Sequence, residues 1–404
     1  MILNGLLRGS DMKGLFAVRL CLLGMMILLF ASCHKEEDAP DVSPCERTLF
    51  MYMPWSGDSY ALTSYFYTNI SDMEDAIREV GLDDERVVVF LSTSSSEATM
   101  FEITCTDGNC QRVTLKEYTS PAFTTIEGLT SILNDVKNFA PAQSYAMTIG
   151  CHGMGWLPVH SRRSRSVDTF KPHWEYEHTL PTRYFGGTSS AYQTDISTLK
   201  ESLEQAGMPM EYILFDDCYM SSIEVAYALR HVAEYLIACP TEIMAFGMPY
   251  AEIGRYLLGE PDYESICREF YEFYSTYQYP YATFGITDCS ELDALASLMR
   301  EINGQYVFDE SQRRDLQPMD GYTPTIFYDY GDYVAHLCGD PALFNQIQAQ
   351  LERTVPYKAH TGRYFSAAGG IKPIWTFSGI TTSAPSISSQ AADWIDTEWY
   401  QDTH

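Results

Sequence analysis

Short apolar runs alternate along the chain with segments in which apolar residues recur at helical spacing. The runs have the length and composition of buried strands and lie at residues 48–53, 86–91, 145–150, 212–215, 235–238 and 282–286. Between two of them, Thr124 and Glu127 have the spacing of a capping box and predict the start of a helix. Another helix is predicted from about Asp195 to Gly207, because glycine commonly ends helices. Strands that alternate with helices predict an α/β fold in which helices cover both faces of a mostly parallel sheet.

Two regions depart from this alternation. Strand-like runs on either side of the turn residues at 106–109 predict a β-hairpin. We expect Cys105 and Cys110, which bracket the turn, to form a disulfide after export. Beyond about residue 290 the pattern becomes more helical. We therefore expect a main domain over residues 47–290 and a C-terminal subdomain over residues 291–404 that completes the fold.

The N-terminal residues have the pattern of an exported bacterial lipoprotein. An apolar run at residues 20–31 follows basic residues and has the length of a signal-peptide core, which is short for a membrane-spanning helix. Two small residues then precede Cys33, as in a lipoprotein processing site. We expect a signal peptide at residues 1–32, a lipid on Cys33 that anchors the protein to a membrane, and a polar tether at residues 33–46. The alternative is an ordinary cleaved signal with an incidental cysteine.

The residues just after the lipidation site indicate which membrane is meant. Acidic residues at 36–38 resemble the surface-export tag of some Gram-negative lipoproteins. The expected location is therefore the bacterial outer membrane, with the protein facing the cell surface.

Net charge excludes one class of partner. The 404 residues include 26 lysines and arginines against 54 aspartates and glutamates, which gives a formal net charge of −28. Such a surface repels the phosphates of nucleic acid, so nucleic-acid partners are not expected. It favours cationic polypeptides as ligands, although solubility alone also explains an acidic surface.

Two segments place a reactive side chain directly after a predicted strand. His152 follows the run at 145–150, and Cys218 follows the run at 212–215 and precedes a predicted helix. Ligands of parallel sheets bind at the carboxyl ends of strands, and a helix N-terminus would lower the pKa of the Cys218 thiol. If the two strands are neighbours, His152 could act as a base, and the amides of Gly153 and Cys218 could bind an oxyanion. Taken alone, a core histidine and an inert buried thiol explain the same pattern.

The residues around these two side chains carry a resemblance. The sequence H-G-M-G-W at 152–156, together with F-D-D-C-Y-M-S-S-I-E-V-A-Y at 215–227, resembles the clostripain family of cysteine peptidases. That family has H-G-x-G-W followed by F-D-x-C-x-M-x-x-x-E-x-A-Y, and the resemblance covers roughly residues 48–290. It implies a caspase-like fold, a three-layer sandwich, and endopeptidase activity on polypeptides. It also implies that His152 is the general base, that Cys218 is the nucleophile, and that Gly153 and Cys218 supply the oxyanion donors.

The family cleaves after arginine or lysine, but the residues for this specificity match the family pattern less well than the catalytic residues do. The resemblance implies that Asp216 helps to form the pocket for the basic side chain. Asp217 stands where a small residue is usual, and Glu242 could add an acid in the loop at 239–250. That loop departs from the family pattern at Cys239, Met244, Phe246 and Met248. Cleavage after non-basic residues is therefore an alternative, as is a surface lipoprotein that binds peptide or glycan without catalysis, which the dense tyrosines at 263–281 would suit.

No cofactor follows from the sequence. Cys151, His152 and Cys218 are too few ligands for a zinc site, and no further histidine or cysteine has suitable spacing. Calcium dependence occurs in the clostripain family, so the resemblance allows a calcium ion. No D-x-D-x-D-G loop is present to place one.

An arginine cluster suggests self-processing. Arg162, Arg163 and Arg165 lie close together in a chain that is poor in positive charge, within a long predicted loop at 157–185. Clostripain-like enzymes are commonly activated by cleavage after a basic residue downstream of the histidine, so the resemblance implies cleavage within 161–166. A solvated basic loop, or one that another protease cuts, is the alternative.

Overall fold

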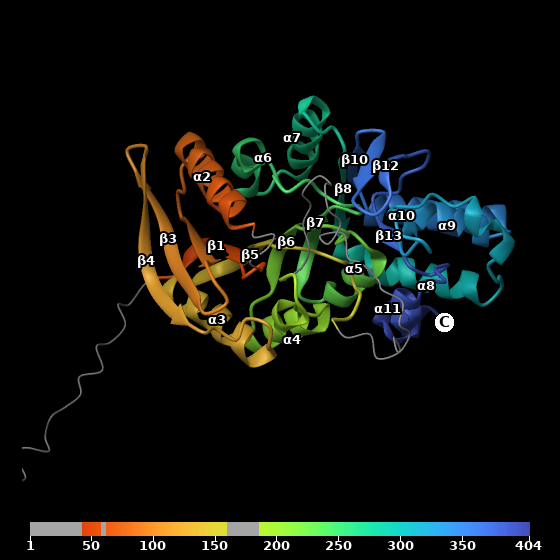
Figure 1. The fold of residues 1–404 in the computed structure, drawn as a ribbon, viewed down its shortest axis with the longest axis horizontal. Helices are drawn as coiled ribbons and strands as arrows, with labels where there is room; N and C mark the ends of the chain where they lie inside the picture. Colours follow the sequence, from red (N-terminus) through yellow and green to blue (C-terminus); the bar gives the residue numbers. More distant parts are fainter. Residues whose placement is uncertain (1–42, 58–61, 160–185) are drawn as a thin grey trace, which may run out of the picture. The chain divides into compact units, whose positions relative to one another are not determined.

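A nine-stranded mixed sheet forms the centre of the protein (Figure 1). The structure is a computed structural model that describes residues 43–57, 62–159 and 186–404. In spatial order the strands are β10 (Tyr357–His360), β8 (Thr283–Asp288), β7 (Ala233–Ala238), β6 (Met210–Asp216), β5 (Ala142–Gly150), β1 (Cys45–Met53), β2 (Glu85–Ser92), β3 (Glu97–Thr106) and β4 (Asn109–Thr119).

The central strands β7, β6, β5, β1 and β2 are parallel, and antiparallel strands complete both edges of the sheet. Almost every residue of β1 and β6 is buried, because the sheet is covered on both faces. Successive residues alternate between the two faces, so that Phe50 and Tyr52 join one apolar core and Leu49 and Met51 join the other. The predicted α/β, caspase-like sandwich is confirmed, with its parallel strands in the centre of a mixed sheet.

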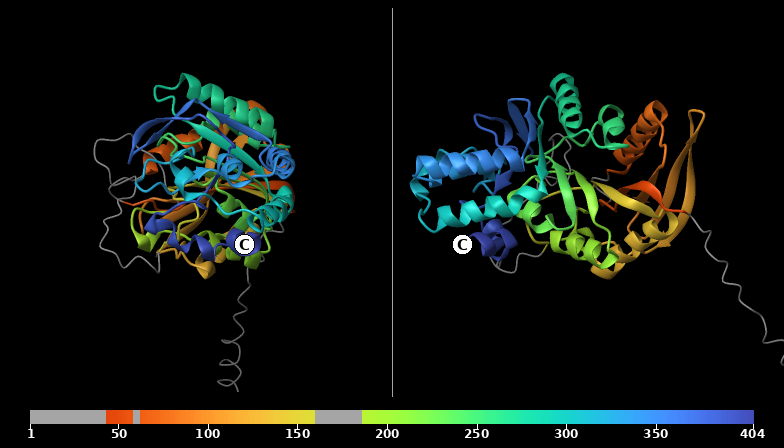
Figure 2. Two further views of the ribbon diagram at one scale, coloured as in Figure 1. Left: turned by 90° about the vertical axis from the view of Figure 1, so that its right-hand side faces the viewer. Right: turned by 180° about the vertical axis from the view of Figure 1, so that it is seen from behind.

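Helices form the two outer layers of the sandwich (Figure 2). One face of the sheet packs against α2 (Thr63–Val80), α6 (Tyr250–Leu257) and α7 (Tyr263–Thr276). The other packs against α3 (Ile126–Phe139), α4 (Ile196–Ala206) and α5 (Ile223–Leu229). Gly207 ends α4 in the left-handed conformation, as its position in the sequence predicts. The cap of α3 is Thr125, which accepts from the Gly128 N–H, and not the predicted Thr124.

The C-terminal residues extend the same core. They form α8 (Leu292–Asn303), β9 (Tyr328–Asp329), α9 (Tyr330–Leu337), α10 (Pro341–Thr354), β11 (Arg363–Ser366), β12 (Gly370–Pro373), β13 (Thr381–Thr382) and α11 (Glu398–Thr403), together with β10 of the central sheet. Short 3-10 helices are η2 (Ser190–Tyr192), η3 (Cys289–Glu291), η4 (Glu310–Arg314) and η5 (Ser389–Asp396). Residues 44–404 form one compact unit, so the region after residue 290 is part of the main fold.

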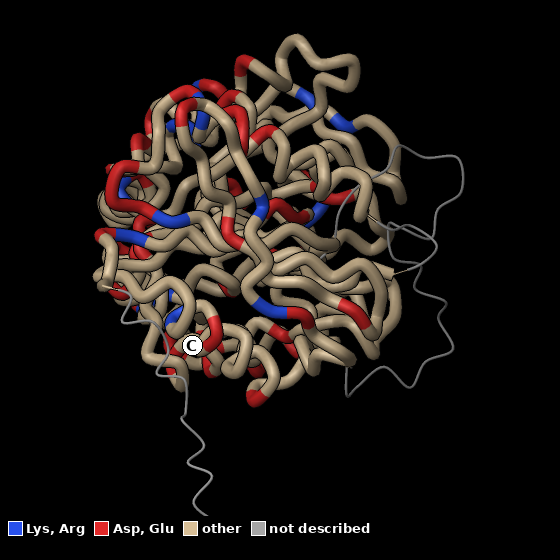
Figure 3. The backbone as a smooth tube through the Cα atoms, turned by 90° about the vertical axis from the view of Figure 1, so that its left-hand side faces the viewer, with Lys and Arg blue, Asp and Glu red and all other residues tan. Residues whose placement is uncertain are grey.

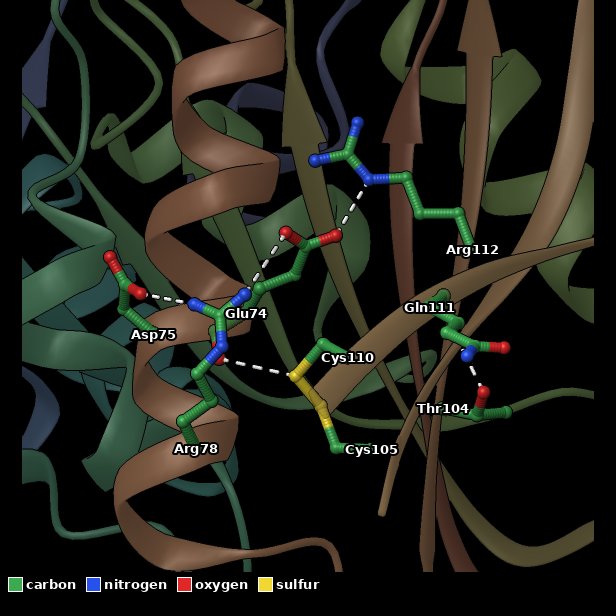
Figure 4. Close-up of a disulfide and its surroundings, with 8 residues drawn as sticks. All are labelled: Glu74, Asp75, Arg78, Thr104, Cys105, Cys110, Gln111 and Arg112. Carbon is green, nitrogen blue, oxygen red and sulfur yellow. Dashed lines mark hydrogen bonds and ion pairs between the residues drawn. A yellow bond between two sulfur atoms is a disulfide. The ribbon is translucent and has the colours of Figure 1, made fainter. Parts of the chain in front are cut away.

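The hairpin β3–β4 closes one edge of the sheet (Figure 4). Cys105 and Cys110 face each other across the two strands, with their Cα atoms 4.0 Å apart, and their sulfur atoms form a disulfide. Arg112 Nε donates to Glu74 Oε1 at 2.6 Å and so ties the hairpin to α2. The bond and the ion pair together hold this edge strand against the body of the protein.

Candidate active site

The carboxyl ends of β5 and β6 bring His152 and Cys218 to the same edge of the sheet. The two strands are parallel neighbours, and their register pairs Gly150 with Asp216. Each reactive residue therefore lies two positions beyond a paired residue. Both side chains are buried, His152 with 1% and Cys218 with 0% of its surface exposed. The strand arrangement that the proposed dyad requires is thus present.

The backbones of the two loops pack directly against each other. A Cβ atom added to Gly153 would collide with the carbonyl oxygen of Cys218 and would lie 3.0 Å from the Cys218 nitrogen. It would also lie 2.9 Å from the Cβ of Asp217. Only glycine fits at this position. The close approach brings the peptide groups of the two expected oxyanion donors together.

Asp217 links the same two loops through its side chain. Its Oδ1 accepts the Cys151 N–H at 2.7 Å, immediately before His152. From the sequence, the acid could be interpreted only as a charge near a helix start. The link to Cys151 joins residues 66 positions apart, so no local pattern could have indicated it.

The expected position of Cys218 at a helix N-terminus is wrong. Helix α5 begins at Ile223, and Ser222 caps it by accepting the Val225 N–H. The group near the sulfur is instead the Ile243 N–H, which donates to Cys218 Sγ at 3.4 Å. The thiol also lies 3.8 Å from the Ile243 carbonyl oxygen, to which it can donate, so the backbone of Ile243 holds the sulfur in place.

The residue after Cys218 has an uncommon backbone conformation. Tyr219 has a φ of 61°, in the left-handed region. Its N–H donates to the Thr241 carbonyl at 3.1 Å, its hydroxyl donates to Glu242 Oε1 at 2.6 Å, and its ring stacks on Phe327 at 5.0 Å. Such a conformation persists only where several contacts hold it. These contacts fix the direction in which the preceding Cys218 enters the turn.

The two acids expected in the substrate pocket are both buried, with 0% of their surface exposed. Asp216 Oδ1 accepts the Met248 N–H at 2.7 Å and so binds the loop after β7. Glu242 accepts from the Tyr219 hydroxyl, from Ser366 Oγ at 2.7 Å and from the Ala367 N–H. Both carboxylates thus organise the loops around Cys218, and their contact with a substrate remains a prediction.

Asp320 is a further buried acid close to this site, which the sequence did not single out. Its carboxylate accepts the N–H groups of Tyr322, Ile326 and Phe327 and shapes the turn that carries Phe327 onto the Tyr219 ring. Burial raises the pKa of Asp320 to about 7. It lies more than 100 residues from Cys218, so nothing in the local pattern connects the two.

Some of the residues that the sequence singles out, and the calcium ion, are not placed by the structure. Cys33 and the arginines at 162, 163 and 165 lie outside the described residues. Within the three described ranges, no group of three or more histidine, cysteine, aspartate or glutamate side chains could hold a metal ion. The calcium ion that the resemblance allows therefore has no assigned site here.

A helix-covered α/β sheet with His152 and Cys218 at adjoining strand ends defines a caspase-like protein of the cysteine peptidase class. The clostripain family model, Peptidase_C11, matches residues 52–359. The chain therefore belongs to the clostripain family and is a cysteine protease. The match extends well past residue 290, where the sequence resemblance had faded, because the C-terminal elements belong to the same fold.

Solved structures give the same picture. A secreted C11 cysteine protease from Bacteroides thetaiotaomicron, iotapain, is 53% identical, with a TM-score of 0.83 over 90% of this chain and 100% of its own. A clostripain from the same species, in complex with the peptide inhibitor BTN-VLTK-AOMK, is 57% identical, with a TM-score of 0.54 over 55% of this chain and 99% of its own. An inactive zymogen C11 protease from Parabacteroides distasonis is 27% identical, with a TM-score of 0.73 over 90% and 99%. No curated protein matches the chain.

Proposed function

We propose that this cysteine protease is an endopeptidase that uses His152 and Cys218 as its dyad and cleaves after arginine or lysine. The observation that carries the proposal is the register of β5 and β6, which places both residues just beyond paired strand ends. Irreversible labelling of Cys218 tests it. Fast labelling by an arginyl chloromethyl ketone is expected, labelling by non-basic reagents alone would indicate the alternative specificity, and no labelling would indicate a binding protein.

The chemistry follows from the groups at this edge of the sheet. His152 takes the thiol proton, and the Cys218 sulfur attacks the peptide carbonyl carbon. The N–H groups of Gly153 and Cys218 donate to the oxyanion of the tetrahedral intermediate. Collapse of the intermediate breaks the C–N bond, and His152 returns the proton to the leaving amine. Water, deprotonated by His152, then hydrolyses the thioester and restores the thiol.

Asp216 supports the basic specificity. A buried carboxylate facing a guanidinium forms a strong charge-assisted pair, and the relative in complex with BTN-VLTK-AOMK has an inhibitor whose peptide ends in K. Asp216→Asn keeps an oxygen that can accept the Met248 N–H but removes the charge. It should reduce kcat/KM for arginyl substrates about 100-fold and leave reaction with iodoacetamide nearly unchanged. Equal losses in both assays would assign Asp216 a purely structural role.

Self-processing after Arg162, Arg163 or Arg165 would occur between two anchored chain ends. The Val159 N–H donates to Asp195 Oδ1 at 2.8 Å, and the His152 N–H donates to the Gly186 carbonyl at 3.3 Å. Both ends of the intervening segment are thus held at the active-site edge, which favours cleavage within the same chain. Purified wild type should split there into two associated fragments. Cys218→Ala should stay intact until active enzyme is added, and cleavage of the isolated variant would contradict self-processing.

The lipid anchor and outer-membrane location belong to the same proposal. The 53% identical relative is a secreted protease, which supports export. No helix among the residues that the structure describes is both long and apolar enough to span a bilayer. Cys33→Ser should abolish lipid labelling and release the protein from membranes. Persistent membrane association of that variant would show that Cys33 is not the anchor.

A further inference from the structure

A second pocket, of about 660 Å³, lies beside the histidine loop. It is built from the same two chain segments that carry the proposed dyad, together with the start of α4 and the C-terminal residues. The described residues that line it are Trp156, Pro158, Asp195, Ile196, Ser197, Glu224, Ala228, Asp393, Asp396, Thr397 and Glu398.

The lining of this pocket is strongly acidic. It includes five acids and no lysine or arginine among the described residues, in a protein whose backbone carries more acidic than basic positions (Figure 3). At the rim, Asp195 accepts the Val159 N–H, and Glu398 pairs with Lys200 and Arg230. An acidic lining alone does not define a site, but the most buried of these acids, Glu224, adds a second observation.

Glu224 has one carboxylate oxygen whose hydrogen bonding the protein does not complete. Only 2% of the residue is exposed. Its Oε1 accepts from Thr382 Oγ1 at 2.8 Å, the Ser383 N–H at 2.9 Å and Trp394 Nε1 at 2.8 Å. Its Oε2 has no hydrogen-bond partner among the described residues. A buried polar atom without a partner is costly, so a donor from outside would be stabilised there.

We propose that this pocket binds the guanidinium or ammonium group of an arginine or lysine side chain of a polypeptide, with Glu224 Oε2 as its acceptor. The Trp156 ring, held by the bond from its Nε1 to Ser383 Oγ at 2.9 Å, adds an aromatic surface. The proposal rests on the proposed function, because it gives a polypeptide a second basic contact outside the dyad.

Binding by a protein that cannot cleave tests the proposal without peptidase activity. In an Asp216→Asn, Cys218→Ala background, calorimetry compares a peptide containing one arginine with the same peptide containing neutral citrulline. The arginine peptide should bind about 10-fold more tightly. Glu224→Gln, which keeps an oxygen for the Oε1 contacts, should remove most of that difference. Glu260→Gln, in the other acidic pocket near the starts of β1 and β2, is the matched control and should leave it unchanged.

The cation has two sources, a substrate or the chain's own Arg162, Arg163 and Arg165. These three arginines are therefore changed to alanine in a second background. If the arginine peptide binds only in that background, and adding Glu224→Gln to it abolishes binding, the pocket binds a cation and the chain's own arginines are its source. Asp396 is exposed, so Asp396→Asn should fold even if Glu224→Gln does not. It provides a second test, in which the difference in affinity between the two peptides should again become smaller. The proposal is overturned if arginine and citrulline peptides bind equally in both backgrounds, or if neither substitution changes the difference. Loss of peptidase activity alone would not affect this outcome.

Discussion

The backbone at Gly153 in the proposed active site leaves no space for a side chain. Its backbone lies against the peptide of Cys218, so that any side chain would displace one of the two expected oxyanion donors. The two backbones are in close van der Waals contact, so packing requires glycine at this position, as the family pattern also does. A small displacement of reacting groups is enough to slow catalysis greatly.

Gly153→Ala should therefore lower kcat/KM by about 100-fold while the protein stays folded. The readout is hydrolysis of an arginyl substrate together with the melting temperature. Gly304→Ala is the matched control, because its new Cβ would come no closer than 3.4 Å to another atom, the Arg300 carbonyl oxygen. Full activity of Gly153→Ala would show that the two backbones do not need to approach this closely.

Residues that act near their own strand could be predicted from the sequence, and residues that act across the fold could not. His152 and Cys218 follow apolar runs, so their strand-end positions were visible. The partners of Asp217 and Glu242 come from other loops, and Asp320 is connected to the site through Phe327, whose ring stacks on that of Tyr219. Their roles depend on which strands lie side by side, which a single sequence does not reveal.

At the scale of elements, one buried arginine holds several strands together at the edge opposite the dyad. Arg47 of β1 is 4% exposed and donates to Glu85 at 2.7 Å, to Glu211 at 2.7 Å and to the Leu257 carbonyl at 2.8 Å. These contacts join the starts of β1, β2 and β6 to the end of α6. Removing one partner of such a cluster leaves buried charges without compensation.

Arg47→Met should lower the free energy of unfolding by about 3 kcal/mol, because the buried Glu85 would lose its counter-charge. Arg255→Met removes the exposed ion pair with Glu79 and should cost less than about 1 kcal/mol. Urea unfolding of both variants measures the difference. Equal stabilities would mean that the Arg47 cluster contributes no more than a surface pair.

Local signals predicted elements better than their ends. The turn at 106–109 and the flanking strands formed the expected hairpin, since both depend on neighbouring residues. The start of α3 was wrong by one residue because Thr124 and Thr125 are both suitable caps. Cys218 was placed too close to α5 for a related reason: the four residues 219–222 separate them, and nothing in that sequence marks the length of the turn.

For the whole molecule, buried acids should make stability depend on pH. Burial raises the pKa of Asp320 to about 7, above its ordinary value of 3.8, so the folded protein holds a proton that the unfolded chain releases. Its contribution to stability is therefore fully present below about pH 4 and is lost as the pH rises to about 7. The slope is at most about 1.4 kcal/mol per pH unit.

The free energy of unfolding, measured between pH 4 and pH 8, should decline over this window more steeply in wild type than in Asp320→Asn. The comparison uses the slope, so a uniform loss of stability in the variant does not affect it. Parallel curves for the two proteins would contradict the raised pKa.

The overall architecture followed from the sequence because the period of apolar residues distinguishes strands from helices along most of the chain. The particular contacts that residues 291–404 make with the rest of the fold were harder to foresee. Strand β10 pairs with β8, about 70 residues earlier, and Glu224 of α5 binds Thr382 and Ser383. These contacts cross the predicted boundary at residue 290, and such long-range pairing leaves no local mark.

Turnover of a peptide with a single arginine by wild type, Cys218→Ala and His152→Ala tests the proposed dyad directly. Neither substitution adds volume at its buried site, so both variants should fold, with melting transitions as cooperative as that of wild type. Wild type should cleave after the arginine, and each variant should lose at least about 1,000-fold in kcat/KM. Substantial turnover by either folded variant would contradict the dyad.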